Sequence, residues 1–239
     1  LMRIVVTVFV IAFFFALGIF IVQNTHAVQV RYFSNTVETS LWVAGVAAAA
    51  TNNNTGIAGM AWNARFVPVR VGVGSLFFLG DVVTGLRWIP GGYSTGANRL
   101  DRPFHKIVNM SFGSNTGKSG VIYDLFRFLT RQLEQQGLVL VGASGNAGLC
   151  DGVSDPAIQE DVIAVGQSTV DCAVASNGGP ELDLVAPSSG IITTGTANCS
   201  SNFPTPFYGY RVLAGTSVAA PMVSGVAASL VEQNPDWFG

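Results

Sequence analysis

Charged residues are scarce in this sequence of 239 residues, where Asp, Glu, Lys and Arg together make up 11%. Only two residues are lysines, and the formal net charge at pH 7 is −2. A nucleic-acid-binding surface needs clustered basic residues and an acidic tail needs a run of carboxylates, so both are excluded as the main function. Hydrophobic residues make up 49% of the chain, which is enough for one domain with a substantial core.

Residues that bind metals or form disulfides are equally few. The three cysteines, Cys150, Cys172 and Cys199, show no C-x-x-C spacing, so no zinc site is predicted. They form either one disulfide, which would fit a domain outside the cytoplasm, or none. The asparagine run 52–54 offers oxygen atoms to a structural calcium ion, but the carboxylates that usually accompany them are missing nearby. We therefore predict no cofactor, with structural calcium as the alternative.

One long run without any charge stands near the start of the sequence. Ile4–Val22 is nineteen residues long, and a helix of that length spans the hydrocarbon core of a bilayer. A cleaved signal peptide, the alternative, usually has a shorter apolar core and a small-residue cleavage site. Residues 2–33 also resemble the membrane domain of lipopolysaccharide assembly protein A, through the segment VQNTHAVQVRYF (22–33). We expect a membrane anchor over residues 1–35 of a bacterial protein, with the rest outside the cytoplasm, or else secretion.

Strand-like and helix-like segments alternate over residues 36–239. Helices are predicted over 41–50, 80–89 and 119–137 and after Ser217, and apolar strands over 65–72, 106–113, 138–144, 161–166 and 181–187. Apolar strands separated by helices indicate a parallel sheet that is covered on both faces. The predicted fold class is therefore α/β, with a three-layer arrangement of a parallel sheet between helices. In such sheets the ligand site lies at the carboxyl ends of the strands.

The helix predicted over 119–137 has the clearest pattern. Ile122, Leu125, Leu129 and Leu133 recur at helical spacing on one face. Ser119 is predicted to cap the start of this helix and Gly137 to end it. The segment GSNTGKSG (113–120) before it has three residues between its first two glycines, where a phosphate-binding loop needs four, so we interpret it as a turn.

The segment AGTSVAAPMVSG (214–225) is the most specific chemical signal. Gly215 permits a sharp turn, and Ser217 falls at the start of a helix, where free N–H groups and the helix dipole favour a developing negative charge. Pro221 is expected in the first turn of this helix, where its missing N–H is not needed. These features suit a serine nucleophile in acyl transfer.

On these residues the chain is similar to the subtilisin-type serine proteases, the subtilases, over residues 39–239. The serine motif of the family, G-T-S-x-A-[AT]-P-x-x-x-G, is matched at every fixed position from Gly215 to Gly225. The resemblance implies a serine endopeptidase that acts on polypeptides, with Ser217 as nucleophile. It implies that the Asn146 side chain and the Ser217 N–H donate to the oxyanion. The residues implied to bind substrate are Ser111, Phe112 and Gly113 on one wall of the specificity pocket, and Ala143, Ser144 and Gly145 on the other.

The general base of the family is missing from this sequence. In subtilases it belongs to the motif H-G-T-x-V-A-G, which corresponds to TSLWVAG (39–45). Thr39 stands at the histidine position, and a threonine accepts no proton at neutral pH. His26 adjoins the membrane segment, and His105 lies six residues before Ser111, or roughly 20 Å along a strand. Neither histidine is expected to be catalytic.

The aspartate of the family's D-[ST]-G motif is not found either, because Glu38 is the only acidic residue before position 81. We expect an N-terminally incomplete subtilase domain, from a truncated or chimeric reading frame, that is catalytically deficient. One alternative is a membrane-tethered pseudoprotease that binds peptides without cleaving them. The other is an active protease with an unrecognised base.

Overall fold

The computed structural model describes residues 38–64, 66–73, 76–91, 107–169, 176–195 and 209–234. All of them belong to the second of two units, residues 1–34 and 35–239, into which internal contacts divide the chain. The predicted membrane segment Ile4–Val22, the histidines His26 and His105, and the cysteines Cys172 and Cys199 lie outside the described residues. In the part that is described, no helix is both long and apolar enough to cross a membrane.

A four-stranded parallel sheet forms the centre of the described domain, as predicted. Its strands are β3 (Ile107–Met110), β4 (Val139–Ala143), β5 (Val162–Ser168) and β6 (Leu184–Pro187), in the order β3-β4-β5-β6. The register places Val108 opposite Leu140 and Leu140 opposite Val162. This row of apolar side chains points into one hydrophobic cluster, which is why the strands read as continuous apolar runs.

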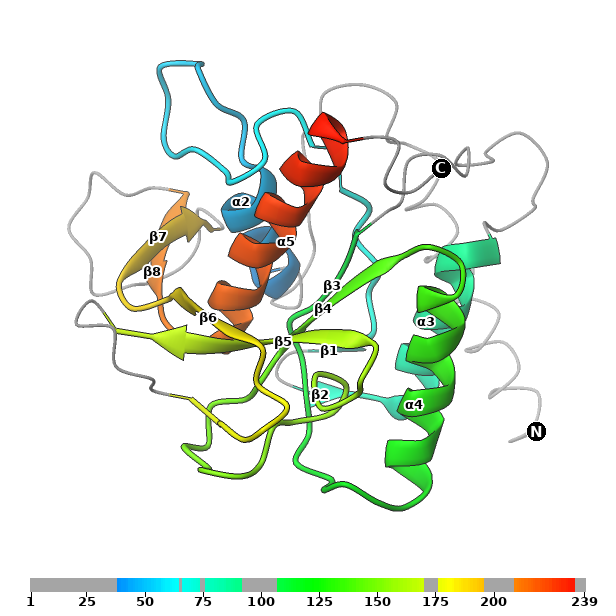
Figure 1. The fold of residues 1–239 in the computed structure, drawn as a ribbon. Coiled ribbons are helices and arrows are strands. Elements are labelled where there is room, and N and C mark those ends of the chain that lie inside the picture. Colours follow the sequence, from blue (N-terminus) through cyan, green and yellow to red (C-terminus); the bar gives the residue numbers. More distant parts are fainter. Residues whose placement is uncertain are drawn as a thin grey trace, which may run out of the picture. The chain divides into compact units, whose positions relative to one another are not determined.

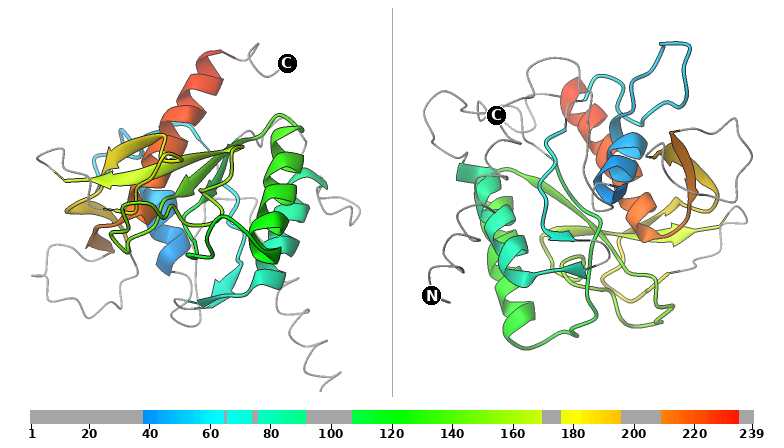
Figure 2. Two further views of the ribbon diagram at one scale, coloured as in Figure 1. Left: turned by 60° about the horizontal axis from the view of Figure 1, so that its bottom comes forward. Right: turned by 180° about the vertical axis from the view of Figure 1, so that it is seen from behind.

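Helices cover both faces of this sheet (Figures 1 and 2). On one face, α3 (Leu79–Gly91) and α4 (Val121–Glu134) enclose a core that includes Val82, Phe126 and Leu129. On the other face α5 (Thr216–Gln233) packs against the strands through Ala219 and Ala220, which are fully buried. The helix α2 (Glu38–Ala48) lies against α5. The three-layer α/β arrangement predicted from the sequence is therefore confirmed.

Both ends of α4 differ from the prediction. Gly120, with φ +100°, is its N-cap, and no side chain bonds to the cap, so the predicted Ser119 cap is wrong. The helix ends at Glu134 with Gln135 as its C-cap, earlier than predicted. Gly137 follows in the turn, where it takes φ +78° and its N–H donates to the Glu134 carbonyl at 2.7 Å.

The predicted face of α4 is confirmed at Leu129 and Leu133, which are buried, and Leu125 packs against the same core. Ile122 is wrong, because it is 37% exposed, and the sequence missed Phe126, which is 1% exposed.

The strand predicted over 65–72 is wrong for most of its length. Residues 66–71 form no strand, and only β1 (Gly72–Val73) pairs, with β2 (Leu76–Phe77) in antiparallel fashion. Pro68 has no N–H to give to a ladder, and it stands in the middle of the apolar run.

An antiparallel pair that the sequence did not predict lies beside α2. It consists of β7 (Ile191–Thr194) and β8 (Tyr210–Leu213). The Thr193 and Thr194 hydroxyl groups donate to the carbonyls of Trp42 and Leu41, each at 2.7 Å. These bonds hold the N-terminal half of α2 in place. The helix begins at Glu38, earlier than predicted, so Thr39 lies in its first turn.

Candidate active site

Ser217 occupies the start of α5, where the sequence placed it. The N-cap is Gly215, with φ +121°, and the first helical residue is Thr216. A Cβ on Gly215 would lie 3.3 Å from Asn146 Oδ1, so this turn needs glycine both for its conformation and for its space. Ser217 is partly exposed, whereas Thr216 and Val218 on either side of it are buried. Ser217 therefore lies partly open to solvent, and borders a groove, at the positive end of a helix.

The position of Pro221 corrects one expectation. It lies inside α5, in the second turn of the helix rather than in the first. A residue at that position would normally donate its N–H to the Ser217 carbonyl, four residues earlier. Proline has no N–H, so the Ser217 carbonyl receives no such bond from it.

Asn146 lies directly against this turn. Its Oδ1 accepts from the Thr216 N–H at 2.9 Å and from the Thr216 hydroxyl at 3.1 Å. The Gly145 N–H donates in turn to Thr216 Oγ1 at 3.2 Å. Because Oδ1 faces Thr216, the amide nitrogen of Asn146 is the atom that can donate to an anionic oxygen beside Ser217. The structure thus brings Asn146 and the serine turn together.

The two predicted walls follow neighbouring strands and border one groove. The groove encloses about 1240 Å³, and its lining includes Ser111, Phe112, Gly113, Ala143, Gly145, Asn146 and Ser217. Ser144 does not line it. Its side chain is fully buried and donates to the Asn177 carbonyl at 3.0 Å. Ser144 therefore stabilises its wall through this buried hydrogen bond and does not face the groove.

Ser154 lies between the two walls, a position that sequence reasoning missed. A Cβ on Gly145 would lie 2.3 Å from Ser154 Oγ, and one on Gly113 would lie 3.0 Å from Ser154 Cβ. The Ser154 hydroxyl donates to Asn115 Oδ1 at 2.6 Å. No local pattern in the sequence identifies Ser154.

Asp155, the residue after Ser154, is a buried carboxylate. Asp155 is 1% exposed. It accepts from Gln159 Nε2 at 2.7 Å and from the Thr116 hydroxyl, and its backbone pairs with that of Ser114. Burial raises the pKa of Asp155 above its ordinary value, and the bonds from Thr116 and Gln159 lower it by a smaller amount.

This raised pKa predicts a pH dependence of stability. The folded state favours the protonated carboxyl group, so its contribution is complete below the ordinary Asp pKa and is lost as pH rises through the raised one. Asp155→Asn is neutral and of similar shape. We expect its stability to rise relative to that of the wild type as pH increases from the ordinary Asp pKa through the raised pKa of Asp155. Urea unfolding of both proteins from pH 4 to 8 measures this difference. A constant difference across the range would contradict the assignment.

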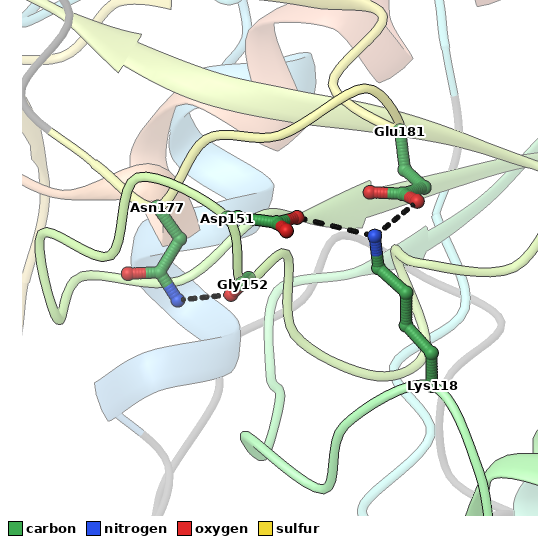
Figure 3. Close-up of polar contacts among 5 residues, drawn as sticks. All are labelled: Lys118, Asp151, Gly152, Asn177 and Glu181. Carbon is green, nitrogen blue, oxygen red and sulfur yellow. Dashed lines mark hydrogen bonds and ion pairs between the residues drawn. The ribbon is translucent and has the colours of Figure 1, made fainter.

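Lys118 is engaged by two carboxylates (Figure 3). Its Nζ lies 2.7 Å from Glu181 and 3.1 Å from Asp151. Hydrogen bonds to Glu181 and Asp151 raise the Lys118 pKa. Lys118 and Asp151 are exposed and Glu181 is partly exposed, so each pair contributes little to stability. The contacts join the segment over 113–120 to two neighbouring loops.

No histidine stands among the described residues of this groove, and the one carboxylate among them, Glu232, lies at the opposite end of α5 from Ser217. Trp42 and Val43 of α2 line the same groove as Ser217, so the first half of α2 borders the site. Thr39 precedes them on that helix. The described residues contain no histidine. They also contain no group of three or more His, Cys, Asp or Glu side chains that could hold a metal. The asparagine run 52–54 forms an exposed loop.

Comparison with known proteins agrees with this geometry. A sequence model described as "Subtilase family" (Peptidase_S8) matches residues 41–238. The "Extracellular basic protease" of Dichelobacter nodosus is 34% identical over 191 residues, which are 79% of this chain and 30% of that protein. The "Thermophilic serine proteinase" of Bacillus sp. (strain AK1) is 36% identical over 203 residues, which are 80% of this chain and 42% of that protein.

Solved structures show the same likeness. A protease from Pseudoalteromonas arctica PAMC 21717 superposes with a TM-score of 0.68 and 31% identity, covering 81% of this chain and 58% of that one. This chain spans less than half of the length of the two sequence relatives.

Proposed function

The chain belongs to the subtilase family, and we propose that it is a serine endopeptidase by descent whose groove receives polypeptides but cleaves them poorly or not at all. The observation that carries the proposal is the contrast between the groups around the nucleophile and the missing general base. Asn146 is hydrogen-bonded to the Ser217 turn through Thr216, whereas the motif match assigns Thr39, which has no basic side chain, to the position of the general base. The two walls beside Ser217 supply the surface for a polypeptide.

Each chemical role follows from an atom of the site. Ser217 Oγ is the nucleophile that would attack a peptide carbonyl, and the Ser217 N–H and Asn146 Nδ2 would stabilise the negative oxygen that forms. The hydroxyl proton must leave as the new bond forms, and Thr39 cannot take it at neutral pH. The site thus keeps its electrostatic stabilisation and lacks its proton acceptor.

A membrane-tethered pseudoprotease is the second candidate. The groove supports it, because the residues of both proposed walls and of the serine turn border it and no histidine stands among the described residues. In this interpretation residues 1–35 anchor the protein, and the domain binds peptides outside the cytoplasm. A secreted protein is the alternative, and the relative named as an extracellular protease supports it. No role in binding nucleic acid is proposed.

Peptide binding and cleavage test the proposal together. We expect fluorescein-labelled octapeptides of mixed sequence to bind the full chain saturably by fluorescence anisotropy, while mass spectrometry finds them uncut after hours. Ser217→Ala should bind them equally well, because the walls and Asn146 are unchanged. Absence of saturable binding would contradict the groove's role. Fast cleavage that Ser217→Ala abolishes would contradict the deficiency.

A further inference from the structure

Asn177 is the most densely bonded side chain of the described loops, although no sequence motif singles it out. It is fully buried. Its Oδ1 accepts from the Ala147 N–H at 2.8 Å and from the Leu149 N–H at 3.3 Å. Its Nδ2 donates to the Gly152 carbonyl at 2.8 Å, as Figure 3 shows, and also to Asn115 Oδ1 at 3.1 Å. A single amide thus joins two loops.

The backbone of Asn177 adds two further bonds to the same loop. Its N–H donates to the Gly145 carbonyl at 2.9 Å, and its carbonyl accepts from the Ser144 hydroxyl. Gly145 and Ala147 are the two neighbours of Asn146 in the chain. Both are therefore held by one buried residue, which lies about thirty residues further along the sequence.

We infer that Asn177 is the positioning residue for Asn146. The inference rests on the proposed function, in which the Asn146 amide donates to the oxyanion. That donor works only if it is fixed before the reaction, and a displacement of about 1 Å can cost about a hundred-fold in rate. Thr216 holds the end of the Asn146 side chain, and Asn177 holds the backbone on both sides of it.

Asn177 touches the groove only through its partners. Its Nδ2 lies 3.3 Å from Ser154 Oγ, and Ser154 lies between the two walls. The same amide therefore fixes the loop that carries Asn146 and the residue that separates the walls. A change at Asn177 should move Asn146 relative to Ser154 even while the sheet stays folded.

Nuclear magnetic resonance of the full-length ¹⁵N-labelled chain tests this inference without any substrate. In Asn177→Ala we expect the Ala147 and Leu149 amides to exchange with solvent at least about ten-fold faster, while amides of β4 change little. The Asn146 side-chain NH₂ signals should shift as well. Asn177→Asp keeps an oxygen acceptor for both amides, so it should restore much of their protection without restoring the bond to Gly152.

Thr130→Val is the matched control. Thr130 is fully buried and its hydroxyl donates to the Phe126 carbonyl on α4, so its loss is a defect away from the site. It should leave the Asn146 signals unchanged. The inference is overturned if Asn177→Ala leaves those signals in place, or if Asn177→Asp exposes the Ala147 and Leu149 amides. Failure of the chain to bind peptides would reject the proposed function but would not alter these signals.

Discussion

A fluorophosphonate probe will label the purified full-length chain slowly or not at all. Labelling requires Ser217 Oγ to attack phosphorus, fluoride to leave, and the hydroxyl proton to pass to a base. By the motif match we assign Thr39 to the position of that base, and a threonine hydroxyl accepts no proton at neutral pH. Ser217 at the start of α5 has the electrostatic setting of a nucleophile, and the part of the chain that the structure describes holds no histidine to activate it.

The expected effect on turnover is very large. In subtilisin, a member of the same family, loss of the histidine alone lowers turnover roughly a million-fold, and this magnitude is borrowed from that relative. The oxyanion donors and binding groups leave a residual acceleration of about 10³–10⁴ over water in such variants. We expect this chain to show at most that residual.

In-gel fluorescence measures the labelling rate, with a catalytically active subtilase in a parallel sample. Ser217→Ala gives the background, because it removes the nucleophile and leaves the loop around Asn146 unchanged. Rapid labelling of the wild type that is absent from Ser217→Ala would show that another group takes the proton. The deficiency would then be rejected, although the assignment of Ser217 would stand.

The parts of the fold that the sequence predicted are those in which local pattern and tertiary contact agree. The apolar runs of β3, β4 and β5 are buried or half-buried in the sheet, whereas the edge strand β6 buries only Ala186. The turn at Gly215 is required by the close approach of Asn146. The apolar residues over 65–72 favour a strand, and this prediction was wrong because Pro68 has no N–H to donate to a β-ladder. The start of α4 was misassigned because Ser119 is a good cap by type, but the chain turns at Gly120.

The parts that the sequence could not predict depend on contacts between distant residues. Ser154 and Asn177 are ordinary polar residues in loops, and each gains its role from partners that lie 23 to 62 positions away. The pair β7 and β8 is anchored by Thr193 on Trp42, across 151 positions. Propensity and periodicity describe neighbours in sequence, so these relations become visible only in the fold.

Gly145→Ala will damage both stability and binding far more than the same change at Gly148. Gly145 has φ +106° and Gly148 has φ +67°, so an alanine at either position incurs a backbone cost of about 1–2 kcal/mol. Their surroundings differ. A Cβ at Gly145 would lie 2.3 Å from Ser154 Oγ and 2.4 Å from Asn177 Nδ2, whereas one at Gly148 would meet nothing within 4 Å.

The two side chains that the new methyl group would strike cannot move freely. Both are buried and hydrogen-bonded to each other and to Asn115, so the methyl group must displace the network that separates the walls. Overpacking of this kind costs about 1–3 kcal/mol in addition to the backbone term.

We expect Gly145→Ala to lose about 2–5 kcal/mol in the free energy of unfolding and to bind octapeptides at least about a hundred-fold more weakly. Gly148→Ala should lose about 1–2 kcal/mol and keep its affinity. Urea unfolding and fluorescence anisotropy of the two variants give the comparison. Equal losses in both would mean that Ser154 and Asn177 leave room at Gly145, and the close packing of the two walls would then be wrong.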